Sequence, residues 1–162
     1  PGKLTPEEFE VMKGHAMIGA DALGESIKQV LAARAVRGLS GDGDFSGSAL
    51  DFLEVAQQIA GGHHEKWNGA GYPLGLQGDA IPLPARLMAV ADVFDALISR
   101  RHYKEPYPDE QVMQIMREGR GQHFDPDVAD AFLQNVSKFV EIAQRYRDDH
   151  AEEQAAEHGA KA

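Results

Sequence analysis

The 162-residue sequence contains no cysteine, so the chain can form neither disulfides nor thiolate metal sites. No apolar run approaches the roughly 20 residues that a transmembrane helix needs. Basic residues are also scarce, because 16 Lys and Arg stand against 26 Asp and Glu, for a formal net charge of −10. This charge opposes non-specific binding to DNA but leaves room for a local basic pocket. Any metal must be held by His, Asp and Glu.

The most informative stretch runs from His63 to Pro73, with the sequence His-His-Glu-Lys-Trp-Asn-Gly-Ala-Gly-Tyr-Pro. Two adjacent histidines end an apolar helical stretch, and a glycine-rich turn follows. Adjacent side chains point in different directions on a helix. Both histidines can therefore bind the same ligand only if that ligand lies at the helix end. Neutral imidazole is the commonest protein ligand for metals. The stretch therefore indicates a metal or phosphate site, with a purely structural turn as the alternative.

Apolar periodicity and helix-start signals predict an all-α fold, a bundle of about six helices. Thr5-Pro6-Glu7-Glu8 has the pattern of a capping box, and Asp125-Pro126 has the pattern of a second helix start. We expect helices at about residues 6–23, 25–37, 49–64, 85–99, 109–117 and 126–150.

The remaining segments are expected to lack regular structure. Four glycines between residues 38 and 48 predict a loop, and the spacing of a calcium-binding loop is missing there. The polar, Ala- and Glu-rich end predicts a disordered tail at 151–162 after one domain at 1–150.

Two further residues lie on faces that the periodicity predicts to be buried. His15 falls on the apolar side of the first helix, where its ordinary interpretation is a hydrogen-bonded core histidine. Asp92 lies within the most apolar helix, where an unpaired carboxylate would be costly, so it needs a metal, hydrogen bonds or a cation such as Arg86. Three imidazoles and one carboxylate suit a first-row metal: His15, His63, His64 and Asp92.

Two other features complete the candidate site. Glu65, next to the paired histidines, is a reserve metal ligand or a general base. Residues 100–104, Arg-Arg-His-Tyr-Lys, are the one dense basic segment and directly follow the helix that carries Asp92. A charge run is usually a solvated face, but this position also suits binding of an anion presented to a metal.

In their order, these motifs resemble the HD-GYP domain, a bacterial family of cyclic di-GMP phosphodiesterases among the HD phosphohydrolases. The resemblance covers about residues 1–140. Its matching segments are Lys3 to Glu10, Gly14-His15, Ile18 to Ala20, His63 to Pro73, Gly75-Leu76, Ile81-Pro82, Ala91 to Leu97, Arg101 to Lys104 and Gly121 to Pro126.

The resemblance implies residue roles and a reaction. A site of two or three metals, usually iron or manganese with nickel or zinc as alternatives, would be held by His15, His63, His64 and Asp92. The resemblance also implies that Arg101 and Lys104 contact phosphates and that Tyr72 borders the site. Asp92 and Glu65 are the candidate catalytic residues. The implied reaction is hydrolysis of a phosphodiester in cyclic di-GMP.

The His-Asp pair of the family lies just upstream of the segment that opens this chain, and this sequence does not contain it. We therefore expect a partial HD-GYP domain with little phosphodiesterase activity by itself. The implied partners are cyclic di-GMP, diguanylate cyclase domains at the Gly-Tyr-Pro loop, an upstream receiver or sensor domain and a second copy in a homodimer. The bacterial cytoplasm is the expected location, without DNA binding or a membrane span. The alternative is a non-catalytic cyclic di-GMP receptor or protein-interaction module.

Overall fold

The computed structural model describes residues 4–36, 48–99 and 107–159, and the side chains of 4–36, 50–99 and 107–146. The predicted all-α class is confirmed, since the described part holds isolated β-bridges but no strand. The predicted loop at 38–48, except its last residue, and the basic segment with Arg101 and Lys104 lie outside the described residues. The elements in chain order are α1 (Pro6–Val36), α2 (Ser48–Gly62), the 3-10 helix η1 (Gly78–Ala80), α3 (Leu83–Ile98), α4 (Asp109–Glu118) and α5 (Pro126–Gly159).

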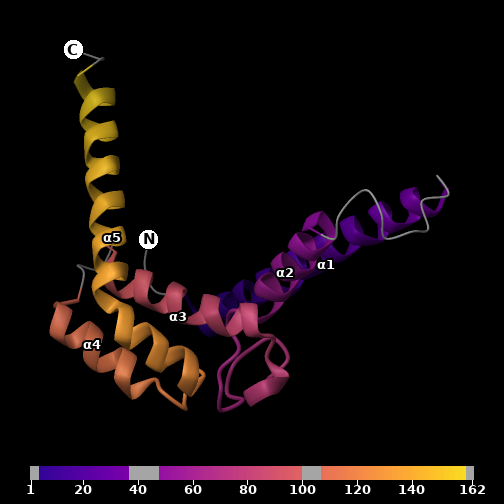
Figure 1. Ribbon diagram of the computed structural model, residues 1–162, viewed down its shortest axis with the longest axis horizontal. Helices are drawn as coiled ribbons and strands as arrows, with labels where there is room; N and C mark the ends of the chain where they lie inside the picture. Colours follow the sequence, from indigo (N-terminus) through magenta and orange to yellow (C-terminus); the bar gives the residue numbers. More distant parts are fainter. Residues whose placement is uncertain (1–3, 37–47, 100–106, 160–162) are drawn as a thin grey trace.

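The helices form two groups that α3 joins. The helices α1 and α2 lie side by side as an arm on one side of the molecule, and α4 and α5 pack with α3 at the other end (Figure 1). The connection from α2 to α3 lies at the junction between the arm and the other helices (Figure 1). Among the described helices, none combines the length and apolar character that crossing a bilayer requires.

Helix α1 is continuous, whereas the sequence predicts two helices separated near Gly24. The missing side chain of Gly24 leaves space for Gln57 of α2, whose Nε2 donates to the carbonyl of Ala20 at 3.1 Å. The glycine therefore marks a close approach of two helices and not a helix end, and the described part has five α-helices where six are predicted.

The predicted capping box at the start of α1 is confirmed. The backbone N–H of Thr5 donates to Glu8 Oε2 at 2.8 Å, and the N–H of Glu8 donates to Thr5 Oγ1 at 3.2 Å. These two bonds satisfy donors that the first turn of a helix otherwise leaves free.

A narrow seam of small residues joins α1 to α2. A Cβ added at Gly19 would lie 3.4 Å from Ala60 Cβ, and one added at Gly61 would lie 3.2 Å from Ala20 Cβ. Because the contact is so narrow, larger apolar residues beside it stay in solvent, and Ile18 is 70% exposed. This explains why the periodicity of α1 predicts more burial than the structure shows.

The main core lies between α3, α4 and α5. Three phenylalanine rings meet in it, with centroids of Phe94 and Phe132 at 5.1 Å and of Phe132 and Phe139 at 4.9 Å. The buried members of the core are Val90, Phe94, Ile98, Val112, Met116, Phe124, Val128, Ala129 and Phe132.

The backbone of α5 is helical to Gly159, into the segment 151–162 that the sequence predicts to be a disordered tail. The division of the chain into one domain and a tail stays a prediction.

An ion pair between Arg86 and Asp125 ties α3 to the start of α5. Arg86 Nη1 lies 2.7 Å from Asp125 Oδ2 and 3.0 Å from Asp79 Oδ1, and the guanidinium lies over the ring of Trp67. Asp125 Oδ1 also accepts the N–H of Asp127 at 2.8 Å, which confirms the predicted cap of the last helix. Arg86 therefore pairs with these two aspartates, and the predicted alternative of a pair with Asp92 is wrong.

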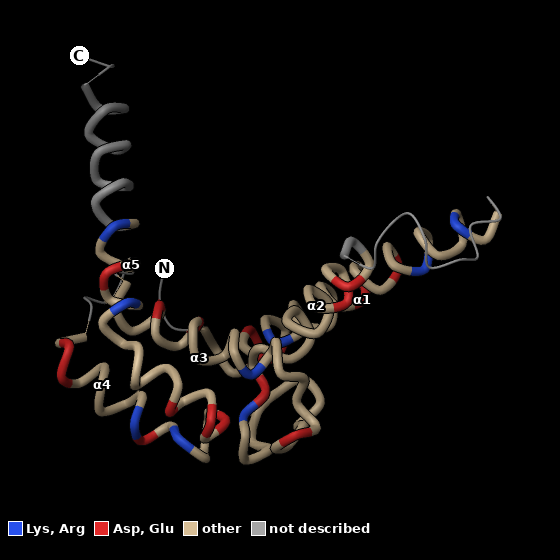
Figure 2. The backbone as a smooth tube through the Cα atoms, in the orientation of Figure 1, with Lys and Arg blue, Asp and Glu red and all other residues tan. Residues whose placement is uncertain are grey.

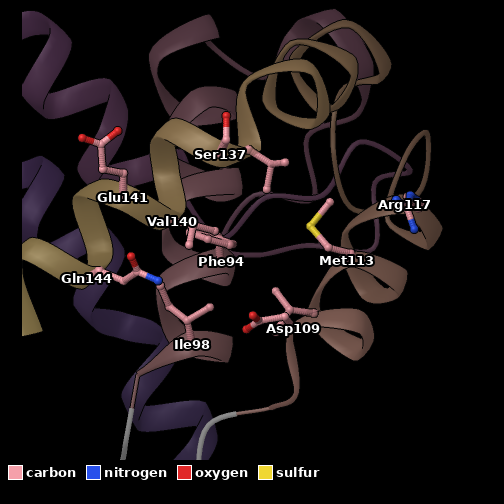
Figure 3. Close-up of a pocket in the computed structure, with 11 residues that line it drawn as sticks. Phe94, Ile98, Asp109, Met113, Arg117, Ser137, Val140, Glu141 and Gln144 are labelled. Carbon is pink, nitrogen blue, oxygen red and sulfur yellow. The ribbon is translucent and has the colours of Figure 1, made fainter.

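A groove of about 460 Å³ opens between α3, α4 and α5. Its floor is apolar, and Met113 of α4 faces Val140 of α5 and Phe94 of α3 across it (Figure 3). None of the described candidate site residues lines this groove, so the candidate chemistry must be sought at the junction with the arm.

We predict that Asp125→Ala lowers the free energy of unfolding by about 3–5 kcal/mol, because it leaves the charge of Arg86 buried without its closest partner. Asp125→Asn keeps a capping oxygen and should lose less. Urea denaturation measures both changes. The control is Asp130→Ala, which breaks the exposed pair with Arg120 and should have a much smaller effect; equal losses from Asp125→Ala and Asp130→Ala would contradict the prediction.

Candidate metal centre

Three imidazoles converge where α1 passes the end of α2. His15 lies in α1, and His63 and His64 directly follow Gly62, the last residue of α2. One ring nitrogen of each lies within 4.8 Å of the others. The sequence places these three histidines and Asp92 at one site, and the structure brings the three histidines together. Their role as metal ligands stays a prediction.

The backbone fixes how His15 and His63 present their nitrogens. His15 Nδ1 lies 2.6 Å from the carbonyl oxygen of Met12, and His63 Nδ1 lies 2.9 Å from that of Ile59. A carbonyl oxygen only accepts hydrogen bonds, so in each neutral ring Nδ1 carries the proton and Nε2 carries the lone pair. The two Nε2 atoms face each other at 3.5 Å. Two facing lone pairs suit a shared cation, and metal-binding histidines commonly donate their other N–H in this way.

His64 completes the cluster and is held neutral by its surroundings. Its ring centroid lies 4.0 Å from that of His63 and 4.7 Å from that of Tyr72. Burial is the main cause that lowers the pKa of His64 to about 4; the neighbouring His63 also lowers it, and the carboxylate of Asp92 acts in the opposite direction. A neutral imidazole is the form that binds metals, so this environment favours ligation at neutral pH.

Asp92 lies beside the cluster but does not belong to it. Its oxygens fall outside the set of ligand atoms that lie within 4.8 Å of one another. The prediction that Asp92 is buried is wrong, because the side chain is exposed at a groove of about 480 Å³ between α2 and α3, which it lines with His63 and Met88. Periodicity places Asp92 on an apolar face of α3, and that face borders this groove and not the core. The same error affects His15, which is exposed beside the narrow seam.

Glu65 serves the loop and not the cluster. Its side chain is 2% exposed, and its two oxygens accept the N–H of Leu74 at 2.7 Å and the N–H of Leu76 at 3.0 Å. Its carboxylate is not among the converging ligand atoms. The contacts therefore favour a role of Glu65 as the anchor of the loop 66–76. Its role as a metal ligand or general base stays a prediction, and these contacts do not support it.

The anchored loop places Tyr72 against His64. The N–H of Tyr72 donates to the carbonyl of His64 at 3.2 Å. A Cβ at Gly71 would collide with the backbone of Glu65 and Lys66, so this close return requires glycine. Tyr72, predicted to border the site, does so, and its ring also contacts Phe9 of α1 at 6.2 Å between centroids.

His123 lies near the cluster, although the sequence indicates it only as one residue of the matching segment Gly121 to Pro126. Burial is the main cause that lowers its pKa to about 4; the charges of Lys66 and His64 also lower it, and Asp92 acts in the opposite direction. Its carbonyl accepts the N–H of Trp67 at 3.0 Å, which pins the loop to the turn between α4 and α5. The sequence distance of 59 residues from His64 hides this proximity, and only its place in a motif that recurs in the resembled family could have indicated it.

The donor set fits a first-row divalent metal. Three neutral imidazoles suit iron, nickel or zinc, and a nearby carboxylate such as Asp92 would add an oxygen donor of the kind that manganese prefers. His15, His63 and His64 would hold the ion, and the carbonyls behind two of the rings would orient them.

Comparison with known proteins decides the family. The family model described as HD domain matches residues 47–128, a segment that contains His63, His64 and Asp92. The chain belongs to the HD domain family. This confirms the family that the sequence motifs indicate.

Relatives of this HD domain occur in Vibrio cholerae serotype O1. The chain is 50% identical to a probable cyclic di-GMP phosphodiesterase over 93% of its own length and 31% of that protein. It is 51% identical to a cyclic di-GMP phosphodiesterase over 91% of its length and 27% of that protein. A solved structure of a V. cholerae phosphodiesterase specific for cyclic GMP-AMP aligns with a TM-score of 0.47 and 30% identity, over 61% of this chain and 24% of that one. The chain thus spans less than a third of these relatives.

We predict that this HD domain loses stability as the pH falls from about 6.5 to about 4. The folded state holds the pKa of His64 at about 4 against 6.5 in the unfolded chain, so the unfolded chain binds more protons in this window. Urea midpoints between pH 7 and pH 5 measure the loss, which should be smaller in His64→Gln. Identical pH dependence in the variant would show that His64 does not titrate in this way.

We further predict that Glu65→Ala removes the hydrogen-exchange protection of the Leu74 and Leu76 amides and costs about 1–3 kcal/mol of stability, because two backbone donors lose their acceptor. The amide of Gly78, which donates to the carbonyl of Trp67 at 3.0 Å, is the control within the loop. Unchanged exchange of the Leu74 and Leu76 amides would exclude Glu65 as the anchor.

Proposed function

We propose that this HD domain is the metal-binding part of a phosphodiesterase that hydrolyses cyclic di-GMP. The observation that carries the proposal is the pair of Nε2 atoms of His15 and His63, which face each other at 3.5 Å with both Nδ1 atoms held by carbonyls. The two relatives at about half identity, whose names specify cyclic di-GMP phosphodiesterases, support the choice of substrate.

The residues of this chain divide the work by position. The three histidines bind and orient the metal, iron or manganese first and nickel or zinc as alternatives, which when bound would acidify a water and offset charge at the attacked phosphate. Asp92 stands at the open side of the cluster, where its exposed carboxylate can join the ion or accept a proton. Tyr72 covers His64 and limits solvent access. Arg101 and Lys104 are proposed to hold non-bridging phosphate oxygens.

The proposed setting follows from the same resemblance. Cyclic di-GMP is the ligand, and the Gly-Tyr-Pro loop is the proposed contact for diguanylate cyclase domains. A receiver or sensor domain, a homodimer and a cytoplasmic location remain part of the proposal. Tyr72 is half-buried against His64, so such a contact would reach the metal centre through one ring.

One observation favours a non-catalytic receptor as the second candidate. Within the described residues, the cluster of converging ligand atoms contains histidines and no carboxylate. A paired metal site of the hydrolytic kind usually needs a bridging oxygen donor to hold two cations about 3.5–4 Å apart. A receptor would bind cyclic di-GMP at the same place without turning it over.

We predict that the chain binds Mn²⁺ and that His63→Ala weakens the affinity at least about tenfold. Loss of a residue that only supports a metal ligand already weakens metal affinity about tenfold or more, and loss of the ligand itself should weaken it at least as much. Calorimetry measures the affinity, with His123→Ala as a control histidine outside the cluster.

Cyclic di-GMP turnover by the full-length natural protein should require Mn²⁺ or Fe²⁺ and fall in His63→Ala. Binding of cyclic di-GMP without turnover would favour the receptor, and unchanged Mn²⁺ affinity in His63→Ala would refute the metal centre.

A further inference from the structure

Lys13 holds a positive charge at the edge of the histidine cluster. Its Nζ lies 5.1 Å from the ring centre of Phe9 and 5.7 Å from the ring centre of Tyr72. The Tyr72 ring centre in turn lies 4.7 Å from that of His64. The ammonium is thus separated from the candidate metal centre by one aromatic ring.

A second lysine on α1 shows that this placement is not a general property of the helix. Lys28 pairs with Glu25 at 2.7 Å, and Lys13 pairs with Glu10 at the same distance and the same spacing. The side chain of Lys28 is 73% exposed, whereas that of Lys13 is 29% exposed. The ion pairs are alike, so the two aromatic rings account for the difference, and a ring face attracts a cation without neutralising its charge.

Because the surrounding surface is acidic, the positive charge of Lys13 would favour binding of an anionic ligand. The formal net charge is −10, and acidic residues occur along each of the five described helices (Figure 2). A polyanion approaching this surface is repelled unless cations stand at its binding site. Glu10 is 70% exposed, so it stays hydrated when the ammonium of Lys13 turns to another anion.

We propose that Lys13 binds the second phosphate of a cyclic dinucleotide, the one that does not lie at the histidine cluster. The proposal rests on the proposed function. A cyclic dinucleotide carries two phosphates, and a single metal centre can hold only the one that reacts. The flexible stem and point charge of lysine suit a phosphate whose orientation need not be fixed for chemistry. Lys13 is then a substrate-binding residue that selects ligands with two phosphates over ligands with one.

The test compares two ligands and matched variants in the Mn²⁺-loaded protein. Cyclic di-GMP carries two phosphodiesters, and bis(p-nitrophenyl) phosphate carries one. Lys13→Met keeps the apolar stem against the rings and removes the charge. It should weaken calorimetric binding of cyclic di-GMP by about tenfold or more, the loss expected for one charge-assisted hydrogen bond. Binding of the single phosphodiester should change less than about twofold, Lys28→Met should bind both ligands normally, and Lys13→Arg should restore affinity for cyclic di-GMP.

Each other outcome has a distinct meaning. Equal cyclic di-GMP affinity in Lys13→Met and Lys28→Met overturns the role of Lys13 and leaves the proposed function intact. Equal weakening of both ligands by Lys13→Met, with an unchanged melting temperature, places Lys13 at the reacting phosphate and overturns the second-phosphate role. A lowered melting temperature in Lys13→Met without recovery of affinity in Lys13→Arg assigns Lys13 to the fold and overturns it too. If the unaltered protein does not bind cyclic di-GMP, the proposed function fails and the inference fails with it.

Discussion

The junction of this HD domain depends on the carboxylate of Glu65, which is buried and accepts two backbone N–H groups from the same loop. A buried carboxylate is costly unless donors surround it, so the loop cannot move away without exposing or stranding the charge. The chain after His64 is therefore turned back on the helix end. Tyr72 comes to lie on His64, and the loop then meets the turn between α4 and α5. One anion thus fixes the wall of the candidate metal centre.

Much of this arrangement could be predicted from the sequence because it depends on local chemistry. The capping box of Thr5 and Glu8 and the cap at Asp125 need only neighbours three or fewer residues away. The adjacent histidines also indicate a binding site, because two neighbouring histidines at a helix end can act together only on a common ligand. His15 could join them only as a hypothesis, since the packing of α1 on α2 is a long-range contact.

The errors have a common physical origin. Periodicity identifies an apolar face but not what covers it, so Asp92 is predicted in a core and lies at a groove. Composition also cannot distinguish a glycine that ends a helix from one that admits a partner, as Gly24 admits Gln57. Glu65 is read as reactive because of its neighbours along the chain, while the N–H groups that occupy it come from 9 and 11 residues further on.

Because the histidine cluster spans the narrow seam between α1 and α2, a bound ligand would affect how the two helices move against each other. One imidazole belongs to α1 and two belong to the end of α2, so a ligand shared by all three is a cross-link between the helices. Small residues in the seam set how closely the two helices approach, and the separation of the imidazoles follows the register of the two helices. Thermodynamic linkage then makes the effect reciprocal: an ion that holds the register tightens the arm, and any force that shifts α1 along α2 changes the affinity for the ion.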